Sequence, residues 1–106
     1  MTTHHDRQAR ILADVKAERD AQDARFGIQD LPDGTGGLAT VDVADQYRED
    51  CDRAFAAGRG TYRHVFLEEV FEAMAESDSA KLRAELIQAI AVGVKWVEGI
   101  DRRESR

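Results

Sequence analysis

The sequence predicts an all-α protein, on the basis of its breaker residues and its apolar spacing. Proline occurs once, at Pro32, and most of the eight glycines lie in two clusters, so long stretches carry no helix breaker. Within those stretches, apolar side chains recur at the three- and four-residue spacing of amphipathic helices. We therefore expect an all-α fold of four helices.

The first half of the chain is predicted to form two helices. The first runs from about Thr3 to Arg25 and carries few large apolar side chains, so we expect it to be the most exposed. Phe26-Gly27 ends it, and residues 30–37, which contain Pro32 and three glycines, form a loop. The second helix runs from about Val41 to Ala57, and a Gly-Arg-Gly sequence follows it.

The second half is predicted to form two more helices with a short connection. Thr61 is a plausible N-cap for a helix over Tyr62 to Glu76. A Ser-Asp-Ser turn leads to a fourth helix from about Ala80 to Ile100. Its apolar middle predicts burial on several sides, and its expected core stripe consists of Leu82, Leu86, Ile90, Val94 and Val97.

The length of 106 residues predicts one helical domain spanning 1–106, with frayed ends at 1–5 and 102–106. Such a domain buries only a modest core, and low aromatic content makes that core mostly aliphatic. Oligomerisation is a common remedy. We therefore expect a homodimer or homotetramer.

Composition also bears on partners and location. A formal net charge of −6 argues against direct nucleic-acid binding, which needs cationic side chains for the phosphates. The single cysteine, Cys51, predicts a reducing compartment and looks like a small core residue. The N-terminus lacks an apolar signal core, and no apolar run approaches the roughly 20 residues of a membrane span. The expected setting is cytoplasmic, without membrane contact.

Two acidic pairs mark the third and fourth helices. Glu69 with Glu72, and Glu85 with Gln88, are each three residues apart and therefore share a helix face. The short connection suggests antiparallel helices, so the pairs can face each other. Carboxylates gathered at a helix contact are costly to bury unless a cation neutralises them, and oxygen ligands suit Mg²⁺ or Mn²⁺.

The competing interpretation is that these acids lie on solvated helix faces and form ordinary surface ion pairs. Two details oppose it. The acids adjoin apolar positions, and the second pair lies in the least polar helix of the chain. Spacing alone leaves the two interpretations about equally supported.

The pattern Glu68-Glu69-x-x-Glu72, a short turn, then Glu85-x-x-Gln88 resembles the signature of the all-α nucleoside triphosphate pyrophosphohydrolases, the MazG and dimeric dUTPase-like superfamily. A subset of MazG-like proteins from phages and actinobacteria is similar over most of the chain. The shared segments are Glu18-Arg19-x-Ala21-Gln22-Asp23-Ala24-Arg25-Phe26-Gly27, Pro32-Asp33-Gly34-Thr35-Gly36, Arg63-His64 and Trp96-x-x-x-x-Asp101-Arg102. The resemblance implies a four-helix MazG-like bundle, a dimeric or larger assembly, and Mg²⁺-dependent cleavage of an NTP or dNTP into NMP and pyrophosphate.

One position departs from that pattern. The superfamily has Asp where this chain has Gln88, whose amide oxygen can ligate Mg²⁺ but is neutral. One missing charge at about 4 Å is worth up to about 4 kcal/mol at an effective dielectric of about 20. Glu76, one turn beyond Glu72, is a possible source of compensating charge. The alternative function is therefore a catalytically impaired nucleotide-binding or helical interaction protein of the same fold.

The resemblance and the spacing together assign provisional roles. Glu69, Glu72, Glu85 and Gln88 are the expected metal ligands, and Glu68 and Glu69 the expected catalytic carboxylates, with Glu68 either a ligand or a base that orients water. The expected substrate contacts are Lys95 to phosphate and Trp96 and Phe26 to the base, although a solvated Lys, a core or interface Trp and a helix-end Phe are the simpler interpretations. His64 lies too far round its helix to reach the acids, so a capping, surface or subunit-contact role is expected.

Overall fold

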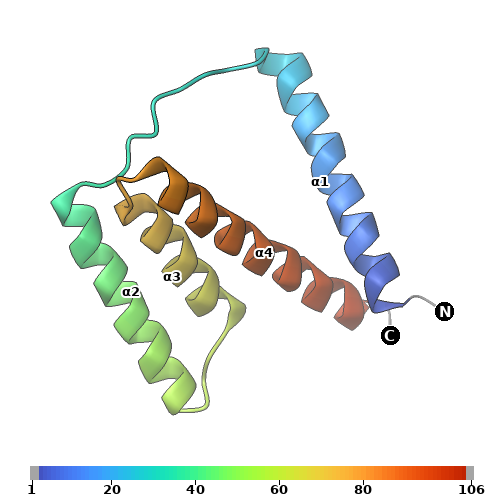
Figure 1. Cartoon of the computed structure of the whole chain (residues 1–106). Helices are drawn as coiled ribbons and strands as arrows, with labels where there is room; N and C mark the ends of the chain where they lie inside the picture. The colour runs from blue at the N-terminus through green and yellow to red at the C-terminus, as the bar shows by residue number, and fades with distance from the viewer. Residues whose placement is uncertain (1–2, 105–106) are drawn as a thin grey trace. The chain divides into compact units, whose positions relative to one another are not determined.

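The computed structural model describes residues 3–104, and within that range it contains helices and no strand, as predicted (Figure 1). The helices are α1 His4–Phe26, α2 Leu38–Ala56, α3 Tyr62–Ala75 and α4 Ser79–Glu104. They divide between two compact units. One joins the chain up to Asp33 with the part from Val94 onward, and the other is Gly34–Gly93.

Two helix ends differ from the sequence prediction by more than one residue. Helix α2 begins at Leu38, three residues early, because the extended Gly37 accepts hydrogen bonds through its carbonyl from the N–H groups of Thr40 and Val41. Helix α4 continues to Glu104, past the expected end at Ile100. Arg102 and Arg103 lie in its last turn, where cations interact favourably with the carbonyl end of the helix dipole.

The chain ends are also more regular than expected within the described residues. Thr3 caps α1 through a capping box in which its hydroxyl accepts from the Asp6 N–H and the Asp6 carboxylate accepts from the Thr3 N–H. His4 and His5 are therefore helical, as are residues 102–104, all of which were expected to fray. Residues 1–2 and 105–106 lie outside the described part.

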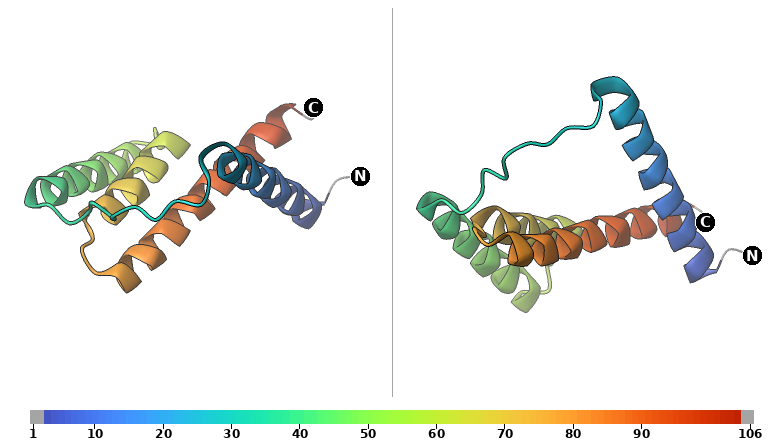
Figure 2. Two further views of the ribbon diagram at one scale, coloured as in Figure 1. Left: turned by 90° about the horizontal axis from the view of Figure 1, so that it is seen from above. Right: turned by 45° about the horizontal axis from the view of Figure 1, so that its top comes forward.

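In the unit Gly34–Gly93, α2 and α3 form an antiparallel hairpin (Figures 1 and 2). Small side chains fill the contact, so the two backbones approach closely; the buried ones are Ala44, Cys51, Ala54 and Ala73. Tyr47 stacks on Phe71 with ring centroids 4.6 Å apart and planes inclined by 17°. The burial of Cys51 confirms its expected place in the core.

The first part of α4 packs with a different face from the one predicted. Leu82 and Ala89 are buried, whereas Leu86 and Ile90 are 38% and 53% exposed. Gly93 follows on the same face as Ala89, and a Cβ added there would lie 3.4 Å from the Phe66 ring of α3. The packed face of α4 therefore contains positions 82, 85, 89 and 93, which are three or four residues apart.

The glycine-containing loop before α2 is tied to the end of α3. Thr35 Oγ1 donates to the carbonyl of Glu76 at 2.6 Å, and the Gly36 N–H donates to the carbonyl of Met74 at 3.0 Å. Gly36 has a φ of 93°, and an added Cβ would lie 2.7 Å from Ser77 Cβ. The loop thus fixes the start of α2 beside the end of α3.

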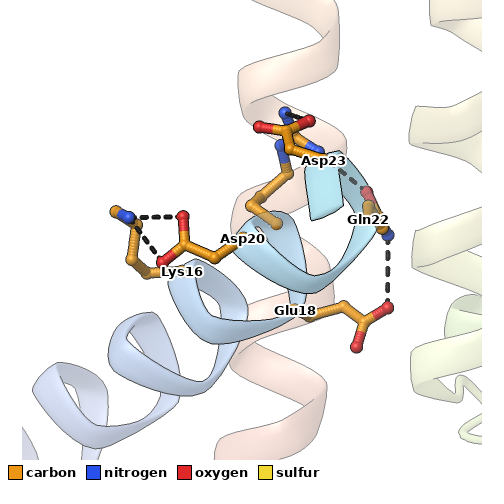
Figure 3. Close-up of polar contacts among 6 residues, drawn as sticks. Lys16, Glu18, Asp20, Gln22 and Asp23 are labelled. Atoms are coloured by element: carbon orange, nitrogen blue, oxygen red, sulfur yellow. Dashed lines mark hydrogen bonds and ion pairs between the residues drawn. The ribbon is translucent and has the colours of Figure 1, made fainter. Parts of the chain in front are cut away.

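In the other unit, α1 is mostly exposed, as expected, and Ile11 is its buried residue. Local pairs four residues apart support the helix, as Figure 3 shows for Lys16 with Asp20 at 2.6 Å. Arg19 similarly contacts Asp23 at 2.9 Å. Such pairs each contribute a few tenths of a kcal/mol, about 0.2–0.5.

Across residues 3–104, no helix combines the length and the apolar composition needed to cross a bilayer.

Candidate metal centre

Three of the predicted ligands converge in the unit Gly34–Gly93. Glu69 and Glu72 come from neighbouring turns of α3, and Glu85 comes from the packed face of α4. One carboxylate oxygen from each lies within 4.8 Å of the other two. The predicted meeting of the two pairs is therefore present for Glu69, Glu72 and Glu85.

The burial of this cluster leaves carboxylate oxygens without partners. Glu69 Oε2 and Glu85 Oε2 are both inaccessible to solvent and accept no hydrogen bond. A buried acceptor without a partner costs about 1–3 kcal/mol, and more when it is charged. These two unpartnered carboxylate oxygens are therefore available as ligands for a cation.

The spacing fits a small divalent cation after minor adjustment. Magnesium takes oxygen ligands at about 2.0–2.1 Å, so two ligands of one ion lie at most about 4.2 Å apart. Oxygens within 4.8 Å of one another need side-chain movements of less than about 1 Å to reach that range. Rotation about glutamate side-chain bonds supplies such movements.

Burial and the neighbouring acids raise the proton affinity of Glu69. The pKa of Glu69 lies above its ordinary value of 4.5, first because burial disfavours its charged form, then because Glu72, Glu68 and Glu85 repel it. No cation is among the causes that act on the pKa of Glu69. A bound cation would reverse both effects.

Sequence reasoning missed one cation at the edge of the cluster. Arg48 of α2 contacts Glu72 at 3.3 Å and Asp45 at 3.3 Å. The hydrogen bond to Glu72 is the main cause that raises the pKa of Arg48. No local signal in the sequence identifies this pair, because the two residues are 24 positions apart and meet only through the register of α2 against α3.

A cavity of about 260 Å³ opens beside the cluster. Its lining residues come from all three helices of the unit and the turn after α3, and are Val41, Ala44, Asp45, Arg48, Glu72, Ala75, Glu76 and Glu85. Glu76, the suggested source of extra charge, is thus present at the cavity. One of its carboxylate oxygens accepts a hydrogen bond from the Asp78 N–H at 3.0 Å.

Glu68 interacts with α2. Its carboxylate is a hydrogen-bond partner of the Cys51 thiol, and this contact adds to burial in raising the pKa of Cys51 to about 11. The thiol therefore stays protonated at neutral pH and donates to Glu68. Glu68 contributes negative charge to the cluster, as the raised pKa of Glu69 indicates, but its side chain is not one of the three that converge.

The remaining predicted site residues lie elsewhere. Gln88 is exposed one turn beyond Glu85 and does not line the cavity. Phe26 is exposed, at 57%, at the end of α1, where it lines a separate cavity and Arg25 lies over its ring. Lys95 is exposed and Trp96 half-buried on the part of α4 that belongs to the other unit.

His64 has the capping role that was among those expected for it. Its Nδ1 accepts a hydrogen bond from the Thr61 N–H at 3.2 Å, while the Thr61 hydroxyl accepts from the His64 N–H at 3.2 Å. This reciprocal pair satisfies two backbone donors at the start of α3 and confirms Thr61 as its N-cap.

No protein-family model matches the chain, and neither a curated protein nor a solved structure matches it. What the arrangement can do is therefore argued from its residues: three clustered carboxylates on two helices, a neighbouring arginine and an adjoining cavity.

Proposed function

We propose that this protein is a Mg²⁺-dependent nucleoside triphosphate pyrophosphohydrolase of the MazG-like type, which converts an NTP or dNTP into NMP and pyrophosphate. The observation that carries the proposal is the convergence of Glu69, Glu72 and Glu85 with two solvent-inaccessible, unpartnered carboxylate oxygens. The order of these acids along the chain, Glu-Glu-x-x-Glu and then Glu, is the order in the family that the sequence resembles.

The donor set suits the metal. Three carboxylates without a sulfur or imidazole ligand favour hard cations such as Mg²⁺, with Mn²⁺ as a substitute. Bound there, the ion would neutralise phosphate charge and activate a water molecule for in-line attack on phosphorus. The cavity beside the cluster gives the phosphates room to approach.

The chain's own residues divide the remaining tasks. Glu69, Glu72 and Glu85 hold the ion, and Gln88 is a fourth, neutral ligand if its side chain turns toward Glu85. Glu68 orients the attacking water or accepts its proton. With an ion bound to Glu72, Arg48 would be free to pair with a phosphate oxygen.

The assembly is part of the proposal. Many large apolar side chains are exposed in the single chain, among them Leu86, Ile87 and Ile90 on α4. Contiguous exposed apolar surface is typical of a subunit contact. We propose a homodimer or homotetramer.

A second function is favoured by one specific contact. Arg48 already neutralises part of Glu72, and the position that carries Asp in the family is the neutral Gln88. A chain with too little negative charge for the metal would keep the fold and bind a nucleotide weakly or act as a helical interaction module.

One experiment separates these functions. The melting temperature is measured with Mg²⁺ or Mn²⁺, with and without nucleotide, and pyrophosphate release is measured against a full NTP and dNTP panel. The enzyme gains stability with metal plus nucleotide and releases pyrophosphate from at least one member. Glu85→Gln should abolish both responses, whereas Glu49→Gln, an exposed acid of α2, should leave them unchanged.

A protein that melts identically with and without these additions and releases no pyrophosphate is not this enzyme. Nucleotide-dependent stabilisation without pyrophosphate release indicates the non-catalytic alternative. In that case Gln88→Asp provides the direct test of the missing charge, because it restores the residue type of the family.

A further inference from the structure

A second cavity lies at the other end of the α2–α3 hairpin from the acidic cluster. Its volume is about 300 Å³, at the lower end of the range of small-molecule sites. Its lining residues are Tyr47, Asp50, Arg53, Ala54, Arg59, Arg63, His64 and Leu67. None of them lines the acidic cavity, and His64 and Glu72 are separated by about 12 Å along α3, at about 1.5 Å per residue.

Positive charge is concentrated in this cavity, although the whole chain carries a net charge of −6. Three arginines line it, and Asp50 is the one acid among the lining residues. Asp50 is paired with Arg53 at 3.8 Å. Within residues 3–104, the side chains of Arg59 and Arg63 form no hydrogen bond or ion pair with the protein.

Helix stability does not account for these charges. Arg53 lies in the last turn of α2, where a cation is favourable. Arg63, however, is the second residue of α3, at the positive end of the helix dipole, where a cation is unfavourable and an anion is favoured. Arg63 therefore opposes the local field unless an anion lies beside it.

The loop that carries Arg59 is held in one conformation. Gly58 has a φ of 72°, and the Arg59 N–H donates to the carbonyl of Ala54 at 2.8 Å. Gly60 packs against the ring of Phe55, because a Cβ there would lie 2.5 Å from ring carbons. A fixed backbone reduces the entropy that Arg59 loses when it binds a ligand.

His64 adds a directed donor. Because its Nδ1 accepts from the Thr61 N–H, the neutral imidazole carries its proton on Nε2. The guanidinium groups and the imidazole N–H are hydrogen-bond donors, and phosphate oxygens are acceptors, so the lining matches a phosphate group.

We propose that this cavity is a phosphate-binding site, which takes inorganic phosphate, pyrophosphate or the phosphates of a nucleotide without a metal ion. Arg59 and Arg63 are the principal ligands, Arg53 completes the positive lining, and His64 donates a hydrogen bond through Nε2. The proposal does not depend on the pyrophosphohydrolase activity, because it requires neither the acidic cluster nor a divalent cation.

The test uses the full chain in EDTA at fixed ionic strength, titrated with inorganic phosphate, pyrophosphate and a nucleoside triphosphate by calorimetry. We expect pyrophosphate to bind, and Arg59→Gln/Arg63→Gln to weaken that binding about tenfold or more, because the variant loses two charge-assisted donors. Arg10→Gln/Arg83→Gln removes the same charge from exposed positions outside the cavity and should change the affinity less than about twofold.

Glu85→Gln should bind pyrophosphate in EDTA as the parent protein does, which separates this site from the acidic cluster. If the nucleoside triphosphate and pyrophosphate bind with the same affinity, the site recognises the phosphate groups alone. If the nucleoside triphosphate binds more tightly and Arg59→Gln/Arg63→Gln weakens both ligands, the natural ligand is a nucleotide. Absence of pyrophosphate binding in EDTA, or equal weakening by the two double variants, would overturn the proposal.

Discussion

At the scale of single residues, the site is governed by unbalanced negative charge. The pKa of Glu69 is raised, because burial and three neighbouring carboxylates all disfavour its ionised form. Arg48 offsets part of this charge through Glu72 but does not reach the orphaned oxygens of Glu69 and Glu85. Repulsion and desolvation at Glu69 therefore destabilise the folded protein, and protonation, amide substitution or a bound cation would remove this cost.

The first prediction concerns pH. Since the folded state raises the pKa of Glu69 above 4.5, the folded state binds this proton more tightly than the unfolded state, and stability falls as pH rises through the raised pKa. Glu69→Gln should therefore raise the melting temperature of the metal-free protein at pH 7–8, and the gain should vanish at a pH below about 4. Thermal unfolding from pH 3.5 to 8 with EDTA measures this.

Saturating Mg²⁺ should reverse the order at pH 8, because the parent binds the ion and the amide variant does not. Glu49→Gln, at an exposed position, controls for the loss of one charge. A melting-temperature gain that is the same at every pH would exclude titration of Glu69 as its cause.

The second prediction concerns Arg48. Its removal in Arg48→Ala frees Glu72 and increases the negative potential, so Mn²⁺ should bind about two- to fivefold more tightly, in line with a partly exposed ion pair worth about 0.2–1 kcal/mol. Turnover should nevertheless fall if Arg48 contacts the substrate phosphate. Metal titration and pyrophosphate release separate the two effects, with Arg10→Ala, at an exposed position outside the acidic cavity, as the control.

At the scale of helices and loops, the site depends on which face of α4 meets α3. The face through Leu82, position 85 and Ala89 packs inward, and it brings the Glu85 carboxylate to the two acids of α3. The loop before α2 holds the start of that helix at the same end of the hairpin, through Thr35 and Gly36. These contacts place Arg48 and Asp45 at the cavity.

The third prediction tests the loop. In Gly36→Ala, the new methyl group meets both a positive φ and the Ser77 side chain 2.7 Å away. Gly34→Ala meets a φ of 71° but no atom within 4 Å. Urea unfolding should therefore show that Gly36→Ala loses at least about 1 kcal/mol more unfolding free energy than Gly34→Ala, the excess being the cost of overpacking. Equal losses would show that this contact does not restrain the loop.

At the scale of the whole molecule, the single chain buries little large apolar surface. Its buried hydrophobic residues are mostly alanines, while Ile87 and Ile90 on α4 are 52% and 53% exposed. A chain of 106 residues with such a small core is expected to gain stability from a subunit contact.

The fourth prediction tests the assembly. Light scattering after size exclusion should give the mass of a dimer or tetramer for the parent protein. Ile87→Glu/Ile90→Glu places two charges on the exposed face of α4 and should shift the mass toward the monomer. The melting temperature of the parent protein should rise with protein concentration, and that of the variant should not. A monomeric parent at micromolar concentration, or an unchanged assembly in the variant, would contradict the expected contact.

Local sequence information was enough for the elements and for much of the site. Helical spacing, the Thr61 cap and the glycine clusters predicted every helix among residues 3–104 to within a few residues, and the Glu-x-x-Glu spacing predicted a shared face on α3. The extension of α4 beyond Ile100 and the early start of α2 were missed, because both ends are decided by terminal hydrogen bonds and charges and not by apolar periodicity.

The sequence by itself determined that the chain is helical and that Glu69 and Glu72 share one face of a helix. Only the tertiary structure decided that Leu86 and Ile90 are exposed, that position 85 faces α3, that Gln88 lies outside the cavity, and that Arg48 pairs with Glu72. The reason is physical. Helix formation and i,i+3 spacing are local properties of the backbone, whereas the register between helices is set by close packing of small residues such as Ala73, Ala89 and Gly93 over long sequence separations.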